Sequence, residues 1–160
     1  MRRFRQLLSV QSAKEILNDS TNGVLSLMDT DGEPYGVPIN YVYDGDKAIY
    51  FHSAVAGRKL DCVAANSRAS FCVVAQDQIV PAEFTSYFRS VIVSGEIQVV
   101  SDQDEIIKGL RLLCQKYSPG IDPTAEITRG LGRVAVLRLD IESLTGKEAI
   151  ELVKQRPASE

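Results

Sequence analysis

The residues best suited to chemistry form a short basic loop in the first half of the chain. Ser53 ends an apolar segment, and Gly57-Arg58-Lys59 follows after a run of small residues. The pattern from Gly57 to Ala65 predicts a two-turn helix, whose first turn carries unpaired backbone N–H groups and the positive end of the helix dipole. Two cations at such an end are unfavourable unless an anion lies there too. We therefore expect Ser53, Arg58 and Lys59 to bind a phosphate group, the alternative being that both cations are simply solvated.

His52 is the only histidine in the chain and stands directly before Ser53. Its charge can change near neutral pH, which makes it a candidate proton donor or hydrogen-bond partner for a substrate. The alternative is a structural histidine at a strand end that bonds to the backbone. The aspartates and glutamates show no paired spacing of the kind that a hydrolase would need.

The elements that must position these residues are mostly strands. Asp44-Gly45-Asp46 predicts the turn of a β-hairpin, and Pro38 requires its strand to lie at an edge or to contain a bulge. Because the strands do not alternate regularly with helices, the sequence predicts a mainly β protein, a closed or nearly closed antiparallel barrel with flanking helices. The six expected strands are residues 24–28, 35–43, 48–53, 70–76, 88–100 and 134–141.

Two further helices are expected, one before the first strand and one between the fifth strand and the sixth. A capping box of Ser12 and Glu15 predicts the start of the first helix, and Ser101 predicts the cap of a second one over residues 102–117. Asn66 is expected to end the basic-loop helix in a left-handed conformation. Residues 77–87 read as irregular, and the tail from 147 to 160 as partly helical at most.

Composition indicates one domain over residues 1–160, with a core of about 10–148 and a tail of about 149–160. The net charge of −3 gives no electrostatic case for nucleic acid or an anionic membrane. The basic cluster Arg2, Arg3 and Arg5 is not followed by the apolar core of a signal peptide, and no apolar run is long enough for a membrane helix, so we expect a soluble cytoplasmic protein. The three cysteines lack a C-x-x-C pair, and we expect free thiols without a disulfide framework or a zinc site.

Several segments together resemble the FMN-binding split-barrel proteins related to pyridoxamine 5′-phosphate oxidase, and in particular the subgroup that includes nitroimidazole-resistance proteins. The order and spacing of these segments agree over about residues 10–148. The resemblance rests on Tyr35-Gly36-Val37-Pro38-Ile39-Asn40-Tyr41, Tyr50-Phe51-His52-Ser53-Ala54, Gly57-Arg58-Lys59-Leu60-Asp61, Tyr87-Phe88-Arg89-Ser90-Val91-Ile92, Leu139-Asp140-Ile141 and Thr145-Gly146-Lys147.

The resemblance implies a six-stranded antiparallel Greek-key split barrel that forms a homodimer, with FMN at the subunit interface. It further implies a flavin-dependent oxidoreductase that takes electrons from a reduced nicotinamide or similar donor and passes them to a small organic molecule. Arg58 and Lys59 would hold the phosphate, with His52 and Ser53 near the ribityl phosphate. Arg89 and Ser90 would approach the flavin from one of the two subunits. The segment expected along the isoalloxazine ring comprises Val37, Pro38, Ile39, Asn40 and Tyr41.

Other readings remain beside this one. The Arg-Leu-x-Pro ending of the true pyridoxamine phosphate oxidases is absent, because the chain reads Arg138-Leu139-Asp140-Ile141, and pyridoxine phosphate is therefore not the expected substrate. A non-enzymatic haem- or flavin-binding module is the alternative function, with His52 as the available haem ligand. FAD or a deazaflavin is an alternative to FMN. Arg89 has the plainer alternative of a surface ion pair with Glu83 or Glu96.

Overall fold

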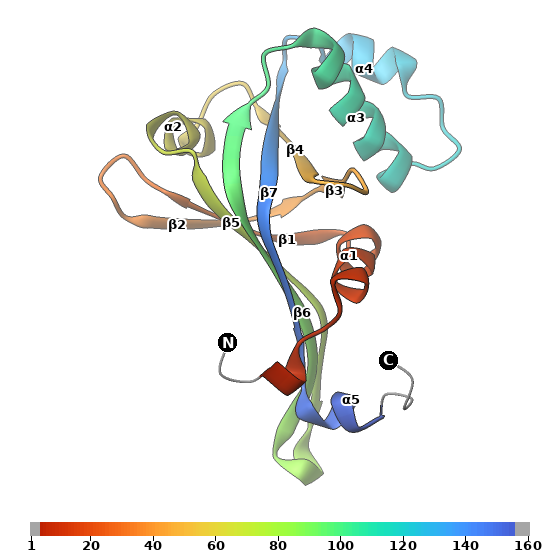
Figure 1. The fold of residues 1–160 in the computed structure, drawn as a ribbon. Coiled ribbons are helices and arrows are strands. Elements are labelled where there is room, and N and C mark those ends of the chain that lie inside the picture. The colour runs from red at the N-terminus through yellow and green to blue at the C-terminus, as the bar shows by residue number, and fades with distance from the viewer. Residues whose placement is uncertain (1–3, 156–160) are drawn as a thin grey trace.

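An antiparallel sheet of seven strands forms most of the protein, and the computed structural model describes residues 4–155. The strands are β1 (Asn22–Met28), β2 (Pro34–Asn40), β3 (Val42–Tyr43), β4 (Ala48–Ala54), β5 (Arg68–Val80), β6 (Thr85–Val99) and β7 (Val134–Glu148). The helices are α1 (Val10–Asp19), α2 (Arg58–Ala65), α3 (Gln103–Tyr117), α4 (Thr124–Gly130) and α5 (Ile150–Gln155), with short 3₁₀ turns η1 (Phe4–Gln6) and η2 (Pro81–Glu83) (Figure 1). The predicted mainly β class with flanking helices is confirmed.

The sheet closes on itself through the segment that contains Tyr41. The strand order is β2-β1-β5-β6-β7-β4-β3, so the two ends of the sheet are β2 and β3. These strands follow one another in sequence with Tyr41 alone between them, which brings the two ends of the sheet together. The sequence predicts six strands because it treats residues 35–43 as one, and the break at Tyr41 makes seven. No strand within residues 4–155 pairs with the outer edge of β2, so the edge position predicted from Pro38 is confirmed.

Alternating strand residues fill the barrel and form its apolar core. In β1 every second residue is buried, including Leu25 and Leu27, as expected where only one face of a strand meets the core. Phe71 lies at the centre, with edge-to-face ring contacts at centroid distances of 4.7 Å to Tyr41 and 5.1 Å to Phe51. Such pairs contribute about 0.5–1.5 kcal/mol beyond the area that they bury.

The hairpin of β5 and β6 is longer than the sequence predicts. The two strands pair from Arg68 opposite Glu96 to Val80 opposite Thr85, and Figure 1 shows the hairpin extending well beyond the barrel. The expectation that residues 77–87 are irregular is therefore wrong for most of that range. The range shows no apolar alternation because this part of the hairpin has no core to bury, and its apolar residues Ile79 and Phe84 are 65% and 98% exposed.

The last strand also runs further than the expected end at Ile141, because β7 continues along the extended part of β6. The pairing reaches Glu148 opposite Arg89, with a bulge at Gly95. A side chain at Gly95 would place its Cβ 1.8 Å from the Asp140 carbonyl oxygen. Glycine is therefore required where β7 shifts its register.

The helix ends differ from the sequence predictions in their capping residues. α1 begins three residues earlier than expected, with Ser9 as N-cap accepting a hydrogen bond from the Ser12 backbone N–H at 3.0 Å. Asp102, rather than Ser101, caps α3, and Asn66 is extended with φ −151°. Ser12 lies one turn after the true cap Ser9 and Ser101 directly before the true cap Asp102, whereas Asn66 does end α2 as predicted but in an extended conformation. α4 was not predicted, α5 forms within the expected tail, and residues 156–160 of that tail lie outside the described part.

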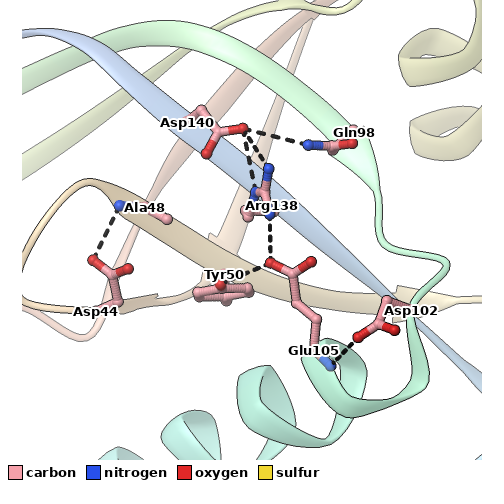
Figure 2. A network of polar contacts seen from close by, with 8 residues as sticks. All are labelled: Asp44, Ala48, Tyr50, Gln98, Asp102, Glu105, Arg138 and Asp140. Atoms are coloured by element: carbon pink, nitrogen blue, oxygen red, sulfur yellow. Dashed lines mark hydrogen bonds and ion pairs between the residues drawn. The ribbon is translucent and has the colours of Figure 1, made fainter.

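A second apolar cluster attaches α3 to the outer side of the barrel. Leu110 and Leu113 of α3 pack with Tyr50 of β4 and Val136 of β7. A polar network borders this cluster and joins α3 to both strands (Figure 2). Its centre is Arg138, which donates to Glu105 at 2.5 Å and to Asp140 at 2.9 Å.

Glu105 is shared between two donors of this network. The Tyr50 hydroxyl donates to the same Glu105 oxygen as Arg138 does, at 3.0 Å. The hydrogen bond from Arg138 holds the pKa of the Glu105 carboxyl below its ordinary value of 4.5. Burial, together with the bond to Glu105, raises the pKa of Tyr50 to about 12. The ionised carboxylate is therefore the state that this network stabilises.

Replacing Glu105 with Gln removes the charge while keeping the side chain's size. We expect the free energy of unfolding to fall by about 1–3 kcal/mol at neutral pH, the value of charge-assisted hydrogen bonds. A carboxyl with a lowered folded pKa stabilises above its unfolded pKa and loses that effect as the pH falls through the folded value. Urea unfolding of both proteins should therefore show a difference that shrinks below pH 4.5.

Glu142→Gln provides the control, because Glu142 pairs with Arg68 at 2.7 Å but half of its side chain is exposed. Exposed ion pairs contribute at most about 1 kcal/mol to the free energy of unfolding. An equal loss in both variants, or a Glu105→Gln effect that is the same at all pH values, would contradict this account of the network.

Candidate functional site

β2 is the strand around which the candidate site is built. Its side chains alternate, so that Val37 and Ile39 are half-buried against the barrel core while Pro38 and Asn40 are exposed. Asn40 also donates its side-chain amide to the Thr21 carbonyl at 3.0 Å. No strand in the described part of the chain pairs with the outer edge of β2, so its main chain can bond to a ligand. The fifth residue of the predicted segment, Tyr41, differs because it is fully buried.

Tyr41 is held by the C-terminal end of α3 and by α1. Its backbone N–H donates to the Tyr117 hydroxyl at 3.0 Å, and that hydroxyl lies 2.8 Å from the Tyr41 carbonyl oxygen and also bonds to the Thr21 carbonyl. The Tyr41 hydroxyl donates to the Leu17 carbonyl at 2.8 Å, and burial raises its pKa. One tyrosine hydroxyl thus replaces the ladder partners that Tyr41 lacks where β2 ends and β3 begins.

The start of α2 has the open geometry that an anion needs. Gly57 is its N-cap with φ 128°, and no side chain bonds to the first turn. The Leu60 N–H donates to the Gly57 carbonyl at 2.8 Å, which leaves the N–H groups of Arg58 and Lys59 without a partner in the helix. Lys59 is half-buried beside them and forms no ion pair with any residue between 4 and 155. The N–H groups and this ammonium fit a phosphate.

Arg58 has two partners within the chain that the sequence did not predict. Its guanidinium lies 2.6 Å from Asp29, a residue of the β1–β2 turn, and 4.3 Å from the ring centroid of Tyr35. A backbone hydrogen bond from Thr30, followed by the bond from Arg58, holds the pKa of Asp29 below its ordinary value. Arg58 therefore has an internal counter-ion, and the argument that its charge requires an external anion is weakened. The contact with Tyr35 does fix the start of α2 beside the first residues of β2.

His52 and Ser53 lie on β4 and point to opposite faces of it. His52 is exposed opposite Val136 of β7, whereas Ser53 is 8% exposed. Because successive residues of a strand face opposite sides, these two neighbours cannot both approach one small group through their side chains. Their roles beside a phosphate stay predictions.

Arg89 and Ser90 lie on the extended part of β6. Arg89 donates to Glu148 at 3.0 Å, so neither Glu83 nor Glu96, the partners considered from the sequence, is its ion-pair partner. Glu148 is 1% exposed. Ile97, near the end of β6, donates to Ser67 just after α2, and eight strand residues between Ile97 and Arg89 span about 26 Å. A single chain therefore keeps Arg89 and Ser90 away from Arg58 and Lys59.

Neither metal ligands nor disulfides contribute to this region. Within residues 4–155, no three His, Cys, Asp or Glu side chains converge as ligands for a metal ion. All three cysteines are free. The described part of the chain contains no helix with the length and apolar character to cross a membrane.

The family is decided by a match over most of the chain. The family model described as pyridoxamine 5′-phosphate oxidase matches residues 9–148. This chain belongs to the pyridoxamine 5′-phosphate oxidase family. The predicted resemblance is thereby confirmed, and the chain has no significant match among curated proteins.

Solved structures of other proteins have the same fold. A candidate 5-nitroimidazole antibiotic resistance protein from Bacteroides thetaiotaomicron has a TM-score of 0.74 at 20% identity, over 89% of this chain and 86% of that one. A flavocytochrome from Azotobacter vinelandii has a TM-score of 0.76 at 22% identity, over 93% and 72%. An FAD-binding protein from Mesorhizobium loti has a TM-score of 0.66 at 26% identity, over 90% and 97%.

Three residues of this region were missed by sequence reasoning. Asp29 lies in the sequence Asp29-Thr30-Asp31-Gly32, which signals only a turn. Tyr117 belongs to the apolar stripe of α3, and its hydroxyl gave no separate signal. Glu148 lies beyond the predicted end of the last strand. Each acts through a partner distant in sequence, which a local pattern does not reveal.

Replacing Tyr117 with Phe should loosen the segment that contains Tyr41. The change leaves the buried Tyr41 N–H without its acceptor, and we expect a loss of about 1–3 kcal/mol in the free energy of unfolding. Urea unfolding measures the loss, and hydrogen exchange of the Tyr41 amide localises it. Tyr87→Phe is the control, because its hydroxyl bonds to Glu83 at the surface. Surface substitutions of this kind change the free energy of unfolding by no more than about 0.5 kcal/mol. Equal losses in the two variants would contradict the role given to Tyr117.

Proposed function

We propose that this protein is a homodimeric, flavin-dependent oxidoreductase that binds FMN along β2. The observation that carries the proposal is the direct connection between an open edge strand and a basic, uncapped helix start. Arg58 makes this connection by lying over Tyr35 of β2. From Tyr35 to Asn40 the strand spans about 17 Å, a length that suits an extended ribityl phosphate and its ring.

The family and its structures support a flavin as the ligand. Proteins of the same fold include a flavocytochrome and an FAD-binding protein. A bound flavin accepts two electrons from a donor and returns them to an acceptor, while the protein orients and protects it. We infer a reduced nicotinamide or similar donor and a small organic acceptor, for which a nitroaromatic compound is one candidate.

Each residue of the proposed site has a distinct part. Lys59 and the first N–H groups of α2 would hold the phosphate. Arg58 would also donate to the phosphate, through the guanidinium N–H groups that do not bond to Asp29. The main chain from Val37 to Tyr41 would bond to the edge of the ring, and Pro38 would press against it. His52, exposed on β4, would hydrogen-bond a substrate or hold a proton for it.

A second copy of the chain would complete the site with Arg89 and Ser90. The outer face of the barrel supports dimerisation because a mostly apolar row of residues lies on it across neighbouring strands: Pro38, Val24, Cys72, Ile92 and Thr145. Val24 is 40% exposed and Ile92 46% exposed. Exposed apolar faces of this kind mark interaction surfaces.

A haem-binding module without catalysis is the second candidate. The flavocytochrome of the same fold favours it, and His52 is exposed and so accessible as a ligand. A flavin-storing module on the same barrel would bind FMN but show no turnover.

The test is an absorption spectrum of the purified protein before and after it is soaked in FMN and desalted. We expect a retained flavin spectrum. In Arg58→Ala/Lys59→Ala the affinity for FMN should fall by about 100-fold or more, because two charge-assisted bonds are lost, while the fold is kept.

The matched control replaces Arg129 and Arg133, two exposed cations near α4, with Ala. This variant should bind FMN as the unmodified protein does. Unchanged FMN affinity in Arg58→Ala/Lys59→Ala would refute the phosphate site. A Soret band that disappears in His52→Ala would favour the haem module over the flavoprotein.

A further inference from the structure

A buried carboxylate lies at the base of the extended hairpin. Glu148 is the last residue of β7 and is 1% exposed. It stands directly opposite Arg89 of β6 in the strand register, and the Arg89 Nε–H donates to its carboxylate at 3.0 Å. Burying a carboxylate is costly unless a partner of good geometry offsets the lost hydration. The contact with Arg89 supplies such a partner.

The two members of this ion pair differ in exposure. The side chain of Arg89 is 43% exposed, whereas that of Glu148 is 1% exposed. Only the Nε–H group bonds to the carboxylate, and among residues 4–155 neither terminal nitrogen of the guanidinium has a hydrogen-bond partner. Arginine carries five N–H groups in one plane. The pair therefore fixes one end of the guanidinium and leaves the other end available to an acceptor.

The backbone that carries Glu148 is firmly packed. The Gln6 side chain, which is 5% exposed, donates its amide to the Glu148 carbonyl at 3.1 Å. The Leu8 N–H donates to the Gly146 carbonyl at 3.0 Å. A Cβ at Gly146 would lie 2.9 Å from the Leu8 Cβ and 3.1 Å from the Ala13 Cβ. The end of β7 is thus pressed against the N-terminal segment and α1, which holds the carboxylate in place under Arg89.

The charge of Glu148 matters for any ligand that Arg89 contacts. Reduction adds two electrons to a flavin ring, and protons offset only part of their charge near neutral pH, so the reduced ring is the more negative form. A cation beside the ring therefore favours the reduced form and raises its potential. Glu148 opposes the positive charge of Arg89 from 3.0 Å away without removing the N–H groups that Arg89 can donate.

We propose that Glu148 is a positioning residue, which fixes Arg89 for the flavin of a second copy and keeps the potential of that flavin low by opposing the Arg89 charge. The inference rests on the proposed function, in which Arg89 completes the site of the second copy. It adds a buried residue that acts on the ligand through Arg89. A lower potential makes the reduced flavin a stronger electron donor to its acceptor.

The test measures the midpoint potential of bound FMN by spectral titration against a reference dye. Glu148→Gln keeps the size and an acceptor oxygen but removes the charge, so the potential should rise. Arg89→Gln removes the cation, so the potential should fall. Each change should alter the ratio of the affinities for reduced and oxidised FMN about tenfold, which is about 30 mV for a two-electron couple.

The sign of the shift separates this role from a purely structural one. If Glu148 only supported the fold, Glu148→Gln would loosen Arg89 and shift the potential in the same direction as Arg89→Gln. The double variant pairs two amides, which keeps the comparison available if the single change at Glu148 prevents folding. Its potential should lie above that of Arg89→Gln, because the only further change is the loss of the Glu148 charge.

Glu142→Gln is the matched control, because Glu142 is also a carboxylate of β7 that pairs with an arginine, Arg68, but half of its side chain is exposed. It should leave the potential of bound FMN unchanged. A potential in Glu148→Gln that falls or stays equal to that of the control would overturn the proposal.

A second readout needs no flavin. Nitrogen-15 NMR of the ligand-free protein should show slow exchange of the Arg89 Nε–H, assigned by its absence in Arg89→Gln. Exchange should be faster in Glu148→Gln, because a neutral acceptor forms a weaker bond than a carboxylate. Equal exchange in the two proteins would show that Glu148 does not fix Arg89. Failure to retain FMN refutes the proposed function, whereas the exchange rate still decides whether Glu148 fixes Arg89.

Discussion

Closure of the sheet at Tyr41 is the constraint on which the rest of the structure depends. One continuous segment pairs with β1 before this residue and with β4 after it. The backbone of Tyr41 therefore needs partners from outside the sheet, and the Tyr117 hydroxyl provides them. α3 is fixed in the position that allows this by its apolar contacts and by the Arg138–Glu105 pair.

The same closure creates the opening that the proposed site uses. Because the chain leaves β1 at Asn40, no strand among residues 4–155 pairs with the outer edge of β2. Arg58 then links the start of α2 to this strand through Asp29 and Tyr35. The groups proposed to bind the phosphate and a strand with an open edge thus meet within one chain, whereas Arg89 and Ser90 lie too far along β6 to reach the start of α2 in the same chain.

The sequence predicted those parts that local patterns determine. The strands of the barrel, the edge position of Pro38 and the helix after Gly57 follow from alternation, turn residues and the missing proline N–H. The extended hairpin was missed because residues 77–87 have no core to bury and so show no apolar alternation. Within the site, the basic loop was visible, but the counter-ion Asp29 and the partner Glu148 were not, since both contacts join residues far apart in sequence.

The most direct test of the central claim compares FMN with riboflavin, which has the same ring and ribityl chain but no phosphate. Quenching of flavin fluorescence during titration gives both affinities. If α2 binds the phosphate while β2 binds the ring, FMN should bind about 100-fold or more tightly than riboflavin, because the charge-assisted bonds at Lys59 and Arg58 are absent without the phosphate. Equal affinities for the two compounds would contradict the account.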